Sequence, residues 1–426
     1  MLVHKSRLSA YAVYLIFTGL FNLAFSCIAT LSMVYQVEVV RLNPLQLVLV
    51  GTTLETVAFV CQVPTGVLAD MYSRRLSVIL GVFLTGIAFI LEGSIPRFEV
   101  VVFAQGLFGI GASLQDGAEQ AWVADEMGEK QVGRVLLRST QIGLITGMLG
   151  ALVSVALGSF RLNIPLLTGG GLAILSAVFL LLFMPEAHFH RVKQGERHSW
   201  YSLTGTFRDG FRAVRGRPLL ITILGIALIY GLFSEGIDRL STAHLLTDVV
   251  LPSLGQFKPV VWFGILSVAS TILTLAATEL VRQRANMSDQ RVIVRVLFVL
   301  NVLGVGSILA FAFAGNFFLA LAALLALRVF RSVNEPIFVT WLTQNSEAKV
   351  RATIISLRGQ LDALGQIAGG PPVGLLGNLF SIRIALASTA AILSPVLGLL
   401  LYAARKIRHS TQPEVVEKEE DRVPIA

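Results

Sequence analysis

The chain has 426 residues, of which 54% are hydrophobic and 14% are charged, and its mean hydropathy is +0.74. A soluble domain carries about 25% charged residues, so this composition excludes an ordinary soluble protein and indicates a membrane protein. The formal net charge of +8 would suit a nucleic-acid-binding protein, but the distribution of the basic residues described below excludes that explanation.

Apolar runs of about 20 residues, the length that crosses the ~30 Å hydrocarbon core of a bilayer, recur along nearly the whole chain. We expect twelve transmembrane helices, at approximately 10–34, 45–68, 76–95, 98–122, 136–159, 163–184, 218–246, 259–280, 293–314, 317–341, 353–378 and 381–403. The predicted fold class is therefore an all-α polytopic membrane protein. The first run is too long for a cleavable signal peptide, and we expect none. Cys27 and Cys61 lie inside apolar runs and are predicted to be buried thiols without a disulfide or metal role.

The basic residues lie mostly on one side of the predicted membrane. With the N-terminus in the cytoplasm, the opposite side receives about one basic residue per loop, namely Arg41, Arg97, Arg161, Lys258 and Arg383. This bias follows the positive-inside rule, so we expect both termini in the cytoplasm and a location in the plasma (inner) membrane. The basic charge then reflects topology, and no nucleic-acid partner is expected.

The longest polar connection divides the helices six and six. We therefore predict a six-helix bundle at 1–184, a cytoplasmic central loop at 185–217, a second six-helix bundle at 218–404, and a disordered cytoplasmic tail at 405–426.

The two halves resemble diverged copies of each other. Glu119 begins a stretch that Glu335 begins again near the inner end of the fourth helix of the second half. The glycines of the fifth helix are likewise repeated in the eleventh, as Gly143, Gly147 and Gly150 against Gly365, Gly369 and Gly370. Two parallel six-helix repeats are typical of one class of secondary transporters.

The most distinctive stretch runs from Gly66 to Arg75, where the second helix is predicted to leave the bilayer. A glycine that looks buried is followed by Asp70 and then by the paired Arg74 and Arg75. A carboxylate near a helix C-terminus opposes the helix dipole, so Asp70 is expected to interact outside its own helix. For the arginines the alternative is simpler, because any cytoplasmic loop attracts basic residues.

This stretch resembles the loop signature of the major facilitator superfamily, a large family of secondary transporters with two pseudo-symmetric six-helix bundles. The resemblance implies that Gly66, Asp70, Arg74 and Arg75 form a latch that joins the two halves on the cytoplasmic side in the outward-open state. Asp125 would then pair with Arg74 or Arg75, and the start of the eleventh helix, near Thr353, would lie against Asp70. Ser73 stands where the family usually has glycine, so we expect a less relaxed turn.

Further stretches resemble bacterial drug:proton antiporters of the same family, namely 62–70, 119–125 and 351–353. Two departures weaken that finer likeness. Val102 replaces the arginine that usually precedes Gln105-Gly106, and the glycine series of the fifth helix lacks its usual proline.

Charged residues within the predicted helices are candidates for proton coupling or substrate binding, because an intramembrane charge costs about 2.5–3.5 kcal/mol on insertion scales. These candidates are Glu55, Asp116, Glu119, Glu235, Asp238, Arg328, Arg331, Glu335, Arg358 and Asp362. The structural alternative for Arg331–Glu335 and Arg358–Asp362 is that each i,i+4 pair neutralises itself. The alternative for Asp238 with Arg239 is a break in the seventh helix. Asp116 is our preferred coupling carboxylate, with Glu55 or Glu119 as a second carrier or cargo contact.

The function predicted from these features is proton antiport that exports small, largely apolar, drug-like compounds by alternating access. One alternative is a carrier of an anionic metabolite or siderophore, which the arginines of the tenth and eleventh helices favour. A membrane-embedded sensor without transport is another. We expect no enzymatic activity, since no nucleotide-binding loop or His-Glu-x-x-His motif occurs. The expected energy source is the proton gradient without a cofactor, and the expected state is a monomer with a small-molecule substrate, protons and the lipid bilayer as partners.

Overall fold

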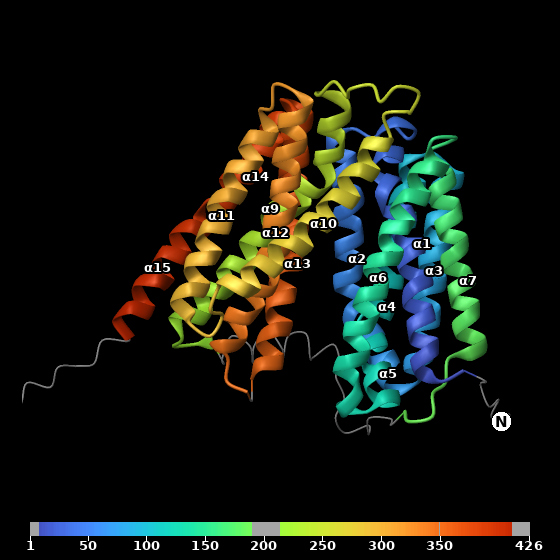
Figure 1. Ribbon diagram of the computed structural model, residues 1–426, viewed down its shortest axis with the longest axis horizontal. Helices are drawn as coiled ribbons and strands as arrows, with labels where there is room; N and C mark the ends of the chain where they lie inside the picture. The colour runs from blue at the N-terminus through green and yellow to red at the C-terminus, as the bar shows by residue number, and fades with distance from the viewer. Residues whose placement is uncertain (1–7, 190–213, 349, 411–426) are drawn as a thin grey trace, which may run out of the picture.

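The structure, a computed structural model, describes residues 8–189, 214–348 and 350–410. Regular structure in these residues is helical, apart from an isolated bridge between Leu254 and Phe257. The helices form two bundles that stand side by side (Figure 1). The first bundle contains α1 (Ala10–Glu38), α2 (Pro44–Met71), α3 (Arg74–Ser94), α4 (Phe98–Gln115), α5 (Ala118–Met127), α6 (Glu129–Gly158) and α7 (Ile164–Phe183). The second contains α9 (Pro218–Thr247), α10 (Val261–Arg284), α11 (Gln290–Ala312), α12 (Phe317–Gln344), α13 (Arg351–Leu379), α14 (Ile382–Leu393) and α15 (Pro395–Ser410).

The prediction of an all-α polytopic membrane fold is confirmed. In the described residues, 11 segments are long and apolar enough to cross a membrane, with α4 and α5 counted as one and α14 and α15 as another. α13 occupies the place of the remaining predicted helix. It is less apolar because it carries Arg358, Asp362 and a Gly369-Gly370-Pro371-Pro372 stretch, and it packs against α9 and α2 in the interior.

Three predicted boundaries are wrong. The fourth predicted helix is interrupted between α4 and α5, because Asp116 has extended backbone and Gly117 adopts a φ of 74° that favours glycine. The seventh shows no break at Asp238–Arg239, since α9 runs without interruption from Pro218 to Thr247. The predicted tail at 405–426 begins too early, because α15 continues to Ser410. Residues 411–426 of that tail, and 190–213 of the predicted central loop, lie outside the described residues.

The repeated glycines make the same helix pair in both bundles. Gly150 of α6 lies against the backbone of α1, where an added Cβ would strike the Leu23 carbonyl oxygen. In the second bundle Gly365 and Gly369 of α13 lie equally close to the backbone of α9 at Leu228 and Leu232. Glycine is required at these positions because any side chain would force the two helices apart. The fifth helix of each half is thus fixed on the first helix of the same half.

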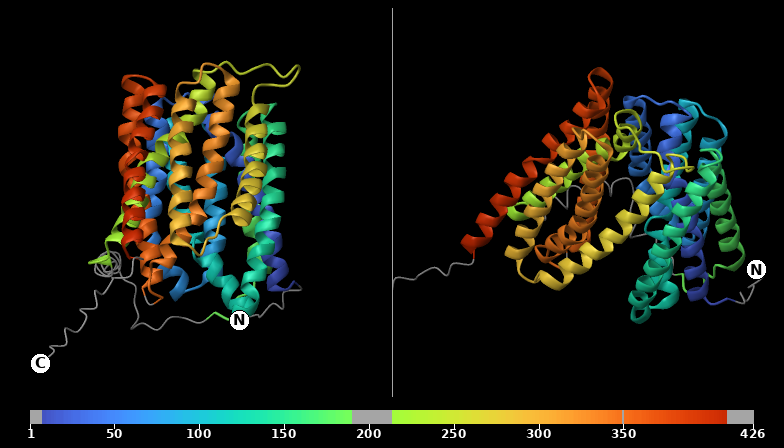
Figure 2. Two further views of the ribbon diagram at one scale, coloured as in Figure 1. Left: turned by 60° about the vertical axis from the view of Figure 1, so that its left-hand side comes forward. Right: turned by 45° about the horizontal axis from the view of Figure 1, so that its top comes forward.

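The two bundles meet at one membrane face and diverge toward the other. We call the face at which α1 begins and α15 ends the terminal face, and the other the opposite face (Figures 1 and 2). Near the opposite face Leu45 N–H donates to Asn378 Oδ1 at 3.2 Å, Gly374 of α13 lies against Val48 of α2, and Gly264 of α10 lies against Val155 of α6. The bundles are therefore closed at the opposite face and separated at the terminal face.

Candidate functional site

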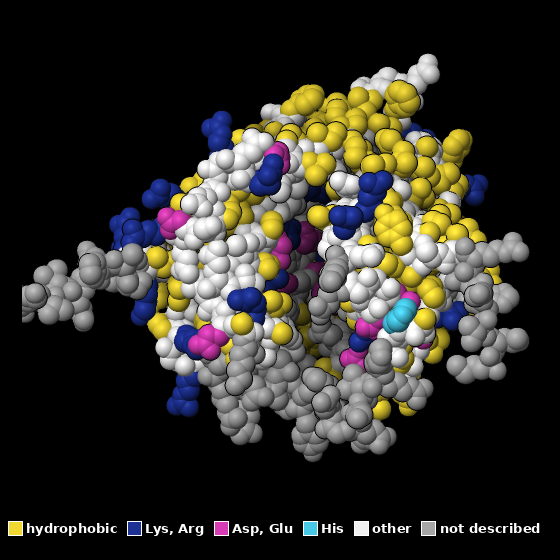
Figure 3. Space-filling model, turned by 60° about the horizontal axis from the view of Figure 1, so that its bottom comes forward, with side chains coloured by type: hydrophobic (Ala, Val, Ile, Leu, Met, Phe, Trp, Pro, Cys, Tyr) yellow, Lys and Arg dark blue, Asp and Glu magenta, His cyan; other side chains and the backbone are white. Residues whose placement is uncertain are grey.

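Two adjoining cavities between the bundles contain most of the candidate coupling and substrate residues. The larger, about 760 Å³, is lined mainly by α9, α10, α11, α12 and α13 of the second bundle, with Leu144 of α6. The smaller, about 490 Å³, is lined mainly by α1 and α6, with Ser267 and Thr271 of α10. Leu144 and Thr271 belong to both linings, so the cavities adjoin. Viewed from the terminal face, the surface is hollowed between the bundles, and acidic and basic side chains are visible in the hollow (Figure 3).

The larger cavity brings together most of the charged residues that the sequence singled out. Its lining includes Asp238, Arg328, Arg331, Glu335, Arg358 and Asp362. Arg331 Nη2 donates to Asp238 Oδ2 at 3.0 Å, and Arg358 Nη2 donates to Glu335 Oε1 at 2.6 Å. Both contacts join different helices, α12 to α9 and α13 to α12. The predicted neutralisation of Arg331 by Glu335 and of Arg358 by Asp362 within one helix is therefore wrong, because each arginine reaches a carboxylate on a neighbouring helix.

Two charged groups of this cavity have no ion pair with any described residue. Arg328, half-buried on α12, makes neither an ion pair nor a hydrogen bond in the described part of the chain. Asp362 of α13 accepts a hydrogen bond from Gln366 Nε2 at 3.0 Å, and no described Lys, Arg or His lies within ion-pair distance of it. The cavity wall thus offers one unpaired cation and one unpaired carboxylate.

Glu55 lies near the ion pair of Glu235 and Arg239, where the two bundles touch. Glu235 and Arg239, both buried in α9, form an ion pair with 2.8 Å between Oε1 and Nε. This pair lies directly against Gly51 of α2, where an added Cβ would clash with both side chains. Glu55 follows Gly51 by four residues and shares its helix face. Its surrounding charges are Glu235, Arg239, Asp238 and Asp362, and in the described residues it has no ion-pair partner. Arg239 therefore has two carboxyl groups near it, those of Glu235 and Glu55.

Asp116 and Glu119 lie apart from this cluster. Asp116 is exposed at the break between α4 and α5 and lines neither cavity. Glu119 of α5 lines the smaller cavity together with Tyr14, Asn22 and Ser139, and it accepts a hydrogen bond from Gln115 Nε2 at 3.2 Å. Asp116 and Glu119 therefore do not share one continuous helix, because the break at Gly117 separates them.

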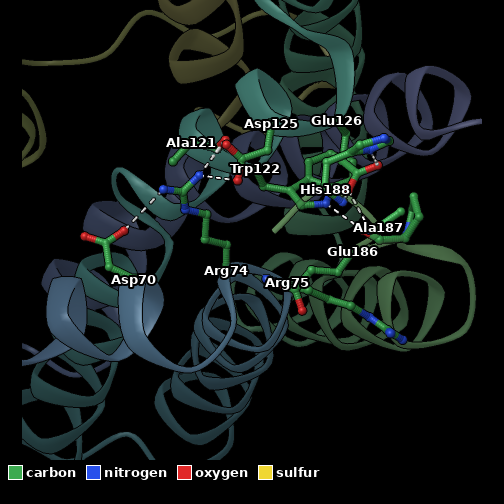
Figure 4. Close-up of polar contacts among 11 residues, drawn as sticks. Asp70, Arg74, Arg75, Ala121, Trp122, Asp125, Glu126, Glu186, Ala187 and His188 are labelled. Atoms are coloured by element: carbon green, nitrogen blue, oxygen red, sulfur yellow. Dashed lines mark hydrogen bonds and ion pairs between the residues drawn. The ribbon is translucent and has the colours of Figure 1, made fainter. Parts of the chain in front are cut away.

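The signature stretch forms a cluster at the terminal face of the first bundle (Figure 4). Arg74, at the start of α3, forms an ion pair with Asp125 of α5, donates to the Ala121 carbonyl oxygen at 3.2 Å, and lies 3.4 Å from Asp70 Oδ1. Arg75 points away and donates to the Leu181 carbonyl oxygen at 2.6 Å. The pairing implied between Asp125 and one of the two arginines is thus present, and Arg74 makes it.

The first residues after α7 pack onto this cluster. Glu186 accepts hydrogen bonds from Ser73 Oγ at 2.7 Å and from Arg75 N–H at 3.0 Å. Glu126 of α5 in turn accepts from the backbone N–H groups of Ala187 at 2.8 Å and His188 at 3.0 Å. The end of α2, the start of α3, α5 and the start of the central connection are thereby joined at the terminal face.

Three expectations about this cluster differ from the structure. Gly66 is exposed rather than buried, with open space around it. Ser73 does not strain the turn, because it has an extended φ of −173° and caps α3 by accepting from Leu76 N–H at 2.9 Å. Asp70 is half exposed and has no hydrogen bond or ion pair to the described residues of α13 near Thr353, since the bundles are separated at this face.

Sequence reasoning missed Glu92. This α3 carboxyl is fully buried and accepts from Gln36 Nε2 at 2.8 Å, Gln105 Nε2 at 2.8 Å and Ser32 Oγ at 3.3 Å. Its position two residues before the end of α3 resembles an ordinary interfacial acid. Ser32 and Gln105 inside apolar runs, and Gln36 just beyond the first of these runs, were the signal that a buried carboxyl group lay between them.

Comparison with known proteins agrees with this architecture. Residues 8–370 match the family model of the Major Facilitator Superfamily. The chain is 20% identical over 379 residues to YxaM, an uncharacterized MFS-type transporter of Bacillus subtilis (strain 168), covering 88% of this chain and 91% of that protein.

Solved structures show the same fold. A bacterial homologue of the human lysosomal transporter Spinster, in an inward-facing and unoccupied conformation, aligns over 95% of this chain and 99% of its own with a TM-score of 0.75 and 15% identity. The nucleoside transporter NupG aligns over 93% of this chain and 99% of its own, with a TM-score of 0.72 and 14% identity. With two six-helix bundles around a polar cavity and a family match over most of its length, the chain belongs to the Major Facilitator Superfamily of membrane transporters.

Proposed function

We propose that this chain is a proton-coupled secondary transporter that exports small organic molecules by antiport. In this proposal the terminal face is cytoplasmic, as the positive-inside rule predicts, and the protein acts as a monomer in the plasma membrane. The structure then represents the state open to the cytoplasm, and rocking of the two bundles exposes the cavities to the other side.

The observation that carries the proposal is that two carboxyl groups have no cationic ion-pair partner among the described residues, Asp362 in the larger cavity and Glu55 beside the closed bundle contact. Carboxyl groups inside the membrane domain of pumps and transporters commonly serve as proton relays. Because both groups lie where rocking would change their access, they are suited to bind a proton from one side and release it to the other. They replace the exposed Asp116 as our preferred coupling residues.

The cavity supports a cargo that is amphipathic. Tyr230, Phe233 and Phe330 contribute aromatic surface, whereas the charged groups of α12 and α13 contribute a polar wall. Drug-like compounds with an apolar body and one polar group fit this description. At the terminal face we assign the Asp70–Arg74–Asp125 cluster to the latch that closes the cavity in the outward-open state.

The test is proton flux in proteoliposomes that contain a pH-sensitive dye, challenged with a panel of lipophilic cations, antibiotics and organic acids. We expect at least one compound to dissipate an imposed pH gradient. Asp362→Asn or Glu55→Gln should abolish this coupling but retain exchange of labelled cargo, which needs no net proton movement. Glu99→Gln is the control, because Glu99 is exposed and distant from the cavity. Unchanged proton coupling in both carboxyl variants would refute the proposal.

A further inference from the structure

We infer that the transported molecule carries an acidic group, a carboxylate or phosphate, and that Arg328 binds it. This inference rests on the proposed function, because it names the substrate class of the same cavity. Its basis is that Arg328 lines the larger cavity without an ion pair or hydrogen bond in the part of the chain that the structure describes.

The neighbouring charges leave Arg328 without compensation. The carboxylate that faces it is Asp238 of α9, and the adjacent cation is Arg331, three residues further along α12. Arg331 contacts both oxygens of Asp238, with Nη2 to Oδ2 at 3.0 Å, so that carboxylate is already engaged. Arg358 is likewise paired with Glu335. Of the two arginines on this stretch of α12, Arg331 therefore has a carboxylate partner, whereas Arg328 has none among the described residues.

An uncompensated, partly desolvated charge is costly to maintain, which argues for a ligand that compensates it. The guanidinium group is planar and has five N–H donors, an arrangement that matches the two oxygens of a carboxylate or phosphate. Arg331 is held against the Phe233 ring at 5.3 Å from its centroid as well as by Asp238, so it is fixed in place. Arg328 has neither restraint and is free to turn toward a ligand.

The surroundings of Arg328 suit the remainder of such a molecule. Asn301 of α11 donates to the Tyr230 hydroxyl at 2.9 Å and to Asn334 Oδ1 at 3.0 Å, and this polar network lines the same cavity as Arg328. Leu300, Leu327 and Phe330 line the same cavity. An aromatic or aliphatic body with one acidic group would bury its apolar part there and present the acid to Arg328.

The experiment measures binding by thermal unfolding of the purified full chain in detergent. The probes are three naphthalenes of similar size: 2-naphthoate, the neutral 2-naphthalenemethanol and the cationic 2-naphthylmethylamine. We expect only the anion to raise the melting temperature in a saturable manner. Arg328→Gln should weaken its apparent affinity about tenfold or more, as loss of a charged hydrogen-bonding partner implies. Arg295→Gln is the matched control, because Arg295 is an exposed arginine of α11 outside the cavity.

Arg328→Lys separates a binding effect from a folding defect. This variant keeps the charge but loses the bidentate geometry, so an intermediate affinity in a folded protein supports the inference even if Arg328→Gln aggregates. Inorganic phosphate and phosphatidylglycerol micelles identify the source of the anion. Stabilisation by phosphatidylglycerol alone would assign Arg328 to a lipid headgroup and overturn the inference.

Two further results would also overturn it. One is an equal or absent response to all three naphthalenes. The other is a response to the cationic probe alone that Asp362→Asn removes, since the unpaired carboxylate would then be the recognition group. Proton coupling distinguishes this failure from failure of the proposed function. If lipophilic cations still dissipate the pH gradient through Arg328→Gln, the transporter proposal stands and only the anion assignment fails.

Discussion

Gly51 is the position at which one added side chain should shift the balance between the two conformations. Glu235 Oε1 and Arg239 Nε occupy the place where a Cβ would lie on this α2 residue. Glu235 and Arg239 are almost fully buried, with relative exposures of 3% and 9%. Their Oε1 and Nε atoms are 2.8 Å apart. To keep that ion pair, both side-chain ends would have to move aside together. Gly51→Val should therefore push α2 and α9 apart at the opposite face.

The size of the effect follows from ordinary overpacking. Inserting methyl groups into a well-packed contact costs about 1–3 kcal/mol, and a difference of that size changes a ratio of two states about 5- to 150-fold. Because the contact exists only where the bundles are closed at the opposite face, the cost falls on the state described here. The other state, closed at the terminal face, should gain population.

The assay is a distance measurement between spin labels on a background with Cys27 and Cys61 replaced by alanine. Labels at Tyr72 and Ala348 report the separation of the bundles at the terminal face, and both positions are exposed. Gly51→Val should raise the short-distance population. Gly171→Val supplies the control, because Gly171 is an exposed α7 glycine with open space around it. If Gly51→Val matches the wild type and this control, the contact at Gly51 does not govern the conformational balance.

Three further variants test the packing and polar contacts. Asp125→Asn should destabilise the first bundle by about 2 kcal/mol, because it leaves the partly buried Arg74 without its closest carboxylate. Thermal unfolding measures this loss. Glu99→Gln is the control, because Glu99 belongs to an ion pair whose side chains are both 73% exposed. Glu92→Leu should lower the stability of the fold more than Glu92→Gln does, since only leucine leaves Gln36, Gln105 and Ser32 without an acceptor at this position. Each buried unsatisfied donor costs about 1–3 kcal/mol. Similar melting temperatures for the two variants would contradict this. Gly369→Leu should prevent recovery of monodisperse protein in size-exclusion chromatography, because the leucine side chain would clash with the α9 backbone. Gly359→Leu is the control and should be tolerated, because Gly359 faces open space on the same helix.

The fold was predictable because the membrane imposes a length and a composition on each spanning segment. The predicted run at 218–246, for example, corresponds to α9 at Pro218–Thr247. The ion pair of Arg74 with Asp125 could be anticipated because the resemblance to the family supplied a spatial relation between two distant residues. Without such a relation, the sequence indicates only which residues share a helix.

The predicted partners within the second bundle were wrong for that reason. The i,i+4 spacing shows that Arg331 and Glu335 lie on one face of α12, but it gives no information on which neighbouring helix faces them. The structure places Asp238 of α9 against Arg331 and Arg358 of α13 against Glu335. Glu92 was missed on the same ground, because its donors come from α1 and α4, more than ten residues away along the chain.

The charges are distributed unequally between two bundles that otherwise repeat the same glycine packing. The described lining of the larger cavity takes its arginines from α12 and α13 of the second bundle, whereas the described lining of the smaller cavity contains Glu119 and neither Lys nor Arg. A cargo held by Arg328 would therefore stay with the second bundle during rocking. The contact that must open is the one that α2 makes with Glu235 and Arg239, and Glu55 is the titratable group that α2 brings to it. Under the proposed function, the second bundle then holds the cargo and one coupling carboxyl group, Asp362, whereas the first bundle supplies the other, Glu55, so the coupling between the bundles acts across the contact at Gly51.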